Sequence, residues 1–183
     1  MISMKSLKKR EEDIMINVRQ NVFETNSSSM HSICIAKQNN YDIPSTLHFG
    51  FGEFGWENRV LYSTEAKASY LYTALLYFID SDHKDEFEDY KNYIYKTLGD
   101  NGCDCDFADV HYDKYGWCDD GYIDHGYELR EWIYMLRHSP KKLLRFLFST
   151  DSFIITGNDN GDTYFETIAE TDFSNVETYV KEN

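Results

Sequence analysis

Short stretches of strand-forming residues lie near both ends of the chain. In residues 29–36 the side chains alternate with a period of two, which predicts a β-strand. Residues 18–23 also carry strand-forming residues, and residues 47–54, interrupted by glycines, predict a bulged strand or a hairpin. Towards the C-terminus, residues 152–156 and 163–168 predict two more strands, joined by a Gly- and Asn-rich hairpin turn.

The middle of the chain instead repeats its apolar residues every three or four positions, which is typical of amphipathic helices. Ser and Asp residues at the starts of these stretches can cap helices, and Pro at a first helical position is favourable. The predicted helices run from Ser63 or Thr64 to about residue 79, from Asp82 to Gly99, from Gly126 to about residue 136, and from Ser139-Pro140 to residue 148, with a short terminal helix opened by the capping-box pattern of residues 174–177.

Strands at both ends with helices between them predict the α+β class. We expect a single domain over residues 15–183, in which a small antiparallel sheet of N- and C-terminal strands packs on a central helical section, because no repeat, linker or break in composition marks a boundary. Residues 1–14 are expected to be poorly ordered, or to be a translated leader. If residues 1–14 are a translated leader, the native protein starts at Met15, because codons for residues 9–12 can form a purine-rich ribosome-binding site. The sequence leaves both interpretations of residues 1–14 open.

Composition narrows the class of protein. The chain has 183 residues, 42% of them hydrophobic and 16% aromatic, which argues against a disordered acidic tail. Its formal charge of −14 disfavours direct binding to nucleic acid or to an anionic membrane, because both require clustered Lys and Arg. Neither a signal peptide nor an apolar run of membrane-spanning length is visible, which predicts a cytoplasmic protein.

The negative charge is concentrated in residues 80–131, which hold 16 acidic and 5 basic residues. Tyr and Trp residues are interleaved with the carboxylates, and we expect several of them, including Tyr90, to be exposed. Such a surface suits docking into a basic groove of a partner protein, although a solvated face alone also explains it. The candidate partner-binding residues are Asp82, Asp85, Glu86, Glu88, Asp89, Tyr93, Asp104, Asp106, Asp109, Tyr112, Tyr115, Trp117, Asp119 and Asp120.

A catalytic alternative combines two polar segments. The first contains Glu24, three consecutive Ser residues and His31, and could hold a nucleophile beside a base. The second places Asp124 beside His125, where a carboxylate could orient an imidazole or help to ligate a metal. A hydroxyl-rich turn and a helix-capping Asp explain the same residues without chemistry. No catalytic residue is therefore assigned; the alternative set is Glu24, Ser27, Ser28, Ser29, His31, Asp124 and His125.

The cysteines give a weak indication of zinc. Cys103 and Cys105 would share one face of a strand, and His111, Cys118 and His125 follow them. Structural zinc sites, however, have two closely spaced ligand pairs, and the second pair is missing here. We therefore predict reduced thiols, with no metal and no cofactor.

Several blocks resemble one family. The segment VFETNSSSMHS over residues 22–32 is similar to the opening of a family of small uncharacterised proteins of Gram-positive bacteria and their phages. The blocks YLYTAL, DGYIDH and IITGNDN, which begin at Tyr70, Asp120 and Ile154, resemble later parts of that family. The resemblance implies no reaction and no catalytic residue.

The phage setting of that family favours an antagonist of host defence. Anti-CRISPR proteins are often small and acidic, and some occupy the basic DNA channel of an RNA-guided nuclease. We therefore expect an inhibitor that blocks DNA access to a type II CRISPR nuclease. The alternatives are a small hydrolase or transferase with a Ser/His/Asp or metal-assisted site, and a phage structural or assembly protein.

Overall fold

The computed structural model describes most of the chain after the N-terminal segment. The predicted strand at 18–23 and residues 1–14 lie outside the described part. The described residues are 29–76, 84–112, 114, 118, 120–124, 129–160 and 162–182.

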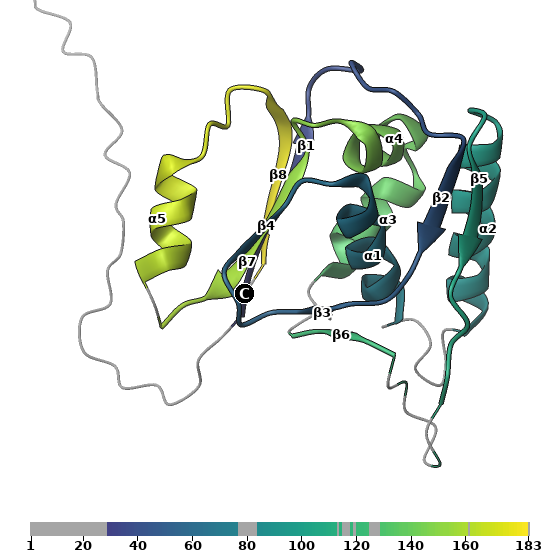
Figure 1. The fold of residues 1–183 in the computed structure, drawn as a ribbon, viewed down its shortest axis with the longest axis horizontal. Coiled ribbons are helices and arrows are strands. Elements are labelled where there is room, and N and C mark those ends of the chain that lie inside the picture. The colour runs from purple at the N-terminus through teal and green to yellow at the C-terminus, as the bar shows by residue number, and fades with distance from the viewer. Residues whose placement is uncertain are drawn as a thin grey trace, which may run out of the picture.

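A four-stranded antiparallel sheet forms the centre of the molecule, in the order β4-β7-β1-β8. Figure 1 shows α5 on one face of this sheet and α1, α3 and α4 on the other. The predicted α+β class, with a sheet of N- and C-terminal strands and central helices, is therefore confirmed. The strands are β1 (Ser29–Ala36), β4 (Arg59–Leu61), β7 (Phe153–Asn158) and β8 (Val176–Glu182), and the helices are α1 (Thr64–Leu75), α3 (Arg130–Arg137), α4 (Pro140–Phe148) and α5 (Asp162–Glu170).

Two short parallel strand pairs extend the helical side. The first pairs β2 (Thr46–Phe49) with β5 (Asp104–Phe107), and α2 (Lys84–Gly99) packs beside it. The second pairs β3 (Glu53–Phe54) with β6 (Tyr122–Ile123). The predicted strand at 47–54 is thus two strands with different partners, and not a hairpin.

Helix capping follows the sequence signals closely. Ser63 accepts a hydrogen bond from the Ala66 N–H at the start of α1, as its side chain predicts. Ser139 caps α4 by accepting from Lys142 N–H, and Pro140 occupies the first turn, where its missing N–H costs nothing. Both predicted helix starts are confirmed.

Two C-terminal predictions are wrong. Residues 163–168 form most of α5, because Tyr164 and Ile168, four positions apart, both face the sheet. The capping box at 174–177 does not form either. Ser174 instead bonds to the Asp172 carboxylate, and the β-branched residues that follow continue as β8.

The sheet separates two hydrophobic clusters. The larger lies between the sheet and the helical side, and Trp132 and Tyr70 are fully buried in it. The smaller, built on Met30, Cys34 and Tyr164, lies beneath α5. Each face of the sheet therefore has its own helical cover.

Because the Cys34 thiol is buried, we expect the protein to lose stability as the pH becomes alkaline. Burial raises its pKa from 9.0 to about 12, so folding favours the neutral thiol. This contribution is complete below pH 9 and is lost as the pH rises towards 12. When the pH is raised from 7 to 10.5, the free energy of unfolding of the unsubstituted protein should fall by about 2 kcal/mol more than that of Cys34→Ala. Urea titrations of both proteins at the two pH values measure this difference. Equal losses in the two proteins would contradict this assignment.

Candidate functional site

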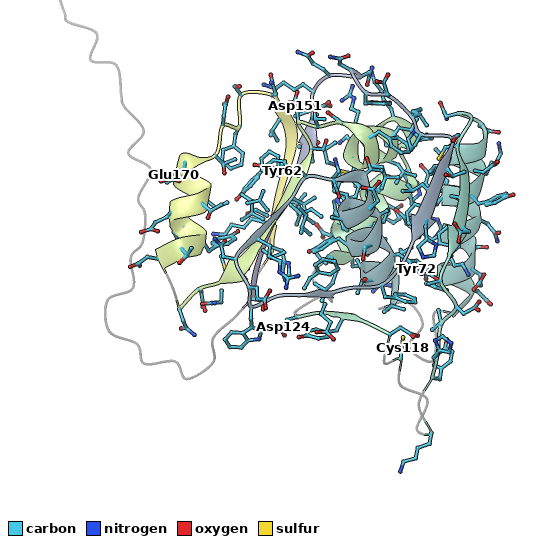
Figure 2. All side chains as sticks on the ribbon, viewed as in Figure 1. Tyr62, Tyr72, Cys118, Asp124, Asp151 and Glu170 are labelled. Atoms are coloured by element: carbon cyan, nitrogen blue, oxygen red, sulfur yellow. The ribbon has the colours of Figure 1, made fainter. Side chains whose placement is uncertain are left out.

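Segments that lie far apart in the sequence meet at the end of the central sheet where β1 begins. Ser29 Oγ, at the start of β1, donates to Asp124 Oδ2 at 2.5 Å, and His31 Nε2 lies 2.9 Å from the Asp124 carbonyl oxygen. The β3–β6 pair positions Asp124, whose N–H donates to the Phe54 carbonyl. Figure 2 labels Asp124 at this end of the molecule. The structure therefore brings together Ser29, His31 and Asp124 of the catalytic alternative.

The His31 ring is held on both sides. A carbonyl oxygen can only accept, so Nε2 carries the proton that it shares with Asp124. Nδ1 lies 3.0 Å from the Tyr70 hydroxyl oxygen, within hydrogen-bond distance. Both side chains are fully buried. The imidazole thus ties β1 to α1 and to the end of β6.

Close approach at this point requires glycine at position 55. A Cβ atom on Gly55 would lie 2.8 Å from Asp124 Cβ and 3.0 Å from Ser29 Oγ. Any larger residue would push the carboxylate away from its hydroxyl donor. A cavity of about 120 Å³ lies on the other side of Gly55, but Ser29, His31 and Asp124 do not line it.

This geometry is not that of a nucleophile with its base. The Ser29 hydroxyl donates to a carboxylate and not to an imidazole, and His31 contacts the backbone of Asp124 and not its side chain. Ser29 and His31 are both 0% exposed, so no substrate reaches them in this arrangement. The cluster fixes the chain segments in place. The remaining members of the catalytic alternative, Glu24, Ser27, Ser28 and His125, lie outside the described residues.

Removing the Ser29 hydroxyl tests this structural role. Ser29→Ala leaves Asp124 without its hydroxyl donor, and we expect the free energy of unfolding to fall by about 1–2 kcal/mol. Chemical denaturation monitored by tryptophan fluorescence measures the change, with exposed Ser45→Ala as the matched control. A loss no larger than that of the control would contradict the role.

The structure describes four of the five candidate zinc ligands, Cys103, Cys105, His111 and Cys118. Cys103 is buried in the core, and Cys105 packs inward from β5. His111 and Cys118 both contact Asp120. Within the described ranges, no three His, Cys, Asp or Glu side chains are placed to hold a metal ion, and His125 lies outside those ranges.

Acidic side chains gather instead where β5 ends beside α2. The Tyr72 hydroxyl donates to the Ala108 carbonyl, next to Asp109, at 2.8 Å; burial raises its pKa, and the charges of Glu88, Asp109 and Asp120 raise it further. Figure 2 labels Tyr72 and Cys118 in this region. Asp104 and Asp106 point outward from β5. We call the five residues Glu88, Asp104, Asp106, Asp109 and Asp120 the acidic edge.

His111 is attached to this edge. It lies 2.8 Å from Asp120, whose hydrogen bond and charge raise the pKa of the imidazole, with a smaller contribution from Asp109. Burial acts to raise the pKa of Asp120, but hydrogen bonds from His111 and Cys118 lower it overall. The Asp120 carboxylate therefore keeps its negative charge.

The acidic residues of α2 lie in different surroundings. Asp89 pairs with Arg137 of α3 at 3.5 Å, and Glu86 lines a small cavity together with Arg130 and Arg137. These two carboxylates are thus placed against basic side chains. Glu88 lies on the opposite flank, towards β5, and Asp85 is exposed between the two flanks.

Of the aromatic residues in the acidic segment, some are buried and others are exposed. Tyr90 is buried and donates to the Ile133 carbonyl, and half-buried Tyr93 donates to the Leu136 carbonyl, so both join α2 to α3. The expectation that Tyr90 is exposed is wrong. Tyr95 of α2 and Tyr112 are 60% and 47% exposed. The other candidate partner-binding residues, Asp82, Tyr115, Trp117 and Asp119, lie outside the described part.

Comparisons with known proteins assign no family to this chain. No family model, curated protein or solved structure matches it. In the part of the chain that the structure describes, no helix is both long and apolar enough to cross a membrane.

Proposed function

We propose that this chain is a binding protein whose acidic edge occupies the basic nucleic-acid groove of a partner. One observation carries the proposal: the acidic edge presents carboxylates from α2, β5 and the segment that follows β5, and two of the five, Asp104 and Asp109, form no ion pair with a described residue. Lys91 pairs with Glu88, His48 with Asp106 and His111 with Asp120. Among the described residues, Asp104 and Asp109 have no basic partner.

Negative charge at a protein surface mainly changes the rate of association with a partner. A negative patch accelerates association with a positive groove and is screened by salt. Exposed Tyr side chains at the margin can then bury their rings against the partner. We propose that exposed Tyr95 and Tyr112 take this role.

The partner class follows from the charge. A groove that binds the phosphates of DNA or RNA presents clustered Lys and Arg, and a carboxylate surface competes for the same side chains. A type II CRISPR nuclease is the partner that we propose to test first. Binding to its DNA channel would make the chain an inhibitor of DNA access, without any reaction at the Ser29–Asp124 cluster.

Charge reversal on the acidic edge tests the proposal. Asp104→Lys/Asp109→Lys removes two unpaired carboxylates, and we expect it to weaken binding to a guide-loaded type II CRISPR nuclease at least about tenfold, measured by biolayer interferometry. The matched control, Asp42→Lys/Glu166→Lys, changes the net charge equally at two exposed residues that are not part of the acidic edge.

The control should weaken binding less than about twofold at physiological salt, where the Debye length is short. Equal weakening by the two double variants would show that overall charge, and not the acidic edge, is responsible. Unchanged binding of Asp104→Lys/Asp109→Lys would remove the edge from the interface.

A further inference from the structure

A separate cavity of about 380 Å³ lies between α5 and the central sheet. Figure 1 shows α5 on the opposite side of the sheet from α2 and β5, so this cavity is remote from the acidic edge. Figure 2 labels Tyr62, Asp151 and Glu170 around it. The function proposed above does not use these residues.

Aromatic rings form one wall of the cavity. Tyr62 follows β4, and its ring lies 5.5 Å from that of Phe153 at the start of β7. Phe153 is buried, but 53% of Tyr62 is exposed. A ring left open at a concave surface offers its face to an apolar or cationic group.

The charged groups of the lining are all acidic: Asp151, Glu170 and Asp172. None of the three has a Lys or Arg partner in the described ranges. Ser174 donates to Asp172 through its N–H and its hydroxyl, at 2.8 and 3.0 Å. These bonds lower the pKa of Asp172, which keeps the carboxylate charged.

The hydroxyl groups on the α5 wall add acceptors and not donors. Thr167 donates its hydroxyl proton to the Thr163 carbonyl, and Thr171 donates to the Thr167 carbonyl. Their oxygens therefore have no proton to offer a ligand; Thr167 Oγ1 already accepts from the Asn58 amide at 3.0 Å and keeps one further lone pair, and Thr171 Oγ1 can also accept. A ligand that supplies N–H donors and positive charge complements this wall.

A bare metal ion fits the cavity poorly. The described part of the chain has no three acidic, His or Cys side chains close enough to hold one ion. Carboxylates spread around an aromatic wall instead suit an extended cation, with charged ends on the carboxylates and an apolar stem on the rings.

We propose that this cavity binds a small organic cation of the alkylguanidinium or alkyldiamine class. Asp151 and Glu170 hold the cationic nitrogens, and Tyr62 covers the methylene stem. The site is independent of the proposed partner and of the Ser29–Asp124 cluster.

Titration with agmatine and putrescine tests the site. At least one of them should bind the full chain at one equivalent by isothermal calorimetry, whereas neutral butylurea should not. Asp151→Asn/Glu170→Gln keeps the side-chain shapes and should weaken binding of that cation at least about tenfold. Tyr62→Leu should weaken it about threefold or more.

A control of equal charge separates this site from general attraction to an acidic protein. Asp42→Asn/Glu166→Gln removes two carboxylates that do not line the cavity, and should leave the affinity within about twofold. The proposal is overturned if neither cation binds at about 10 mM, or if the two double variants weaken binding equally.

Discussion

Trp132→Ala is expected to lower the free energy of unfolding by about 3–5 kcal/mol, the largest effect of any single substitution considered for this protein. Trp132 is 1% exposed and packs edge-on against Tyr70 and Phe146, with ring centroids 5.9 and 5.2 Å away. Truncation removes this contact area and leaves a cavity where α1, α3 and α4 meet. Urea titration followed by circular dichroism measures the loss.

Trp132→Phe provides the comparison. Trp132 Nε1 is buried, with no hydrogen-bond partner among the described residues, so phenylalanine removes an unsatisfied donor along with some volume. We expect Trp132→Phe to cost less than half as much as Trp132→Ala. If the two costs were equal, the packing described for the indole ring would be wrong.

Arg145→Met is expected to lower the free energy of unfolding by about 2–4 kcal/mol. The Arg145 side chain extends from α4 to the sheet, where Nε donates to Asn39 at 2.6 Å and a terminal nitrogen pairs with Glu177. The same nitrogen also donates to the Ala36 carbonyl. Methionine keeps the stem but leaves these acceptors without a donor.

Lys141→Met is the matched control for Arg145. Lys141 is exposed on the same helix, and we expect its substitution to change the unfolding free energy by no more than about 0.5 kcal/mol. Guanidinium denaturation at several salt concentrations measures both variants. A similar small change for Arg145→Met would contradict its role in joining α4 to β1 and β8.

Local signals predicted the parts of the fold that depend on neighbouring residues. The Ser63 and Ser139-Pro140 caps act within one helical turn, and both helices begin where these residues indicate. Residues 163–168 misled because they follow a Gly- and Asn-rich turn and contain Thr, Tyr, Phe and Ile, which are common in strands, although their apolar positions 164, 165 and 168 have helical spacing. Burial of Tyr164 against Gly157 selects the helix, since a Cβ at that glycine would lie 2.8 Å from the ring. That contact depends on tertiary packing, which a local pattern does not contain.

The candidate sites, too, could be predicted where they depend on local sequence and not where they depend on tertiary contacts. The sequence located the acidic segment, because charge is a property of composition. It did not separate Glu88, which faces β5, from Asp89, which pairs with an arginine of α3. Nor could it show that Ser29 meets Asp124, 95 positions away. The cavity beneath α5 was missed because its lining comes from several segments with no shared motif.

Displacement of DNA tests the central claim most directly. A fluorescently labelled duplex bound to a guide-loaded type II CRISPR nuclease is titrated with the full chain, and fluorescence anisotropy reports the bound fraction. We expect the chain to release the duplex, Asp104→Lys/Asp109→Lys to require at least about tenfold more protein, and added salt to weaken the competition. A ternary complex in which the chain binds while the duplex stays bound would contradict the claim.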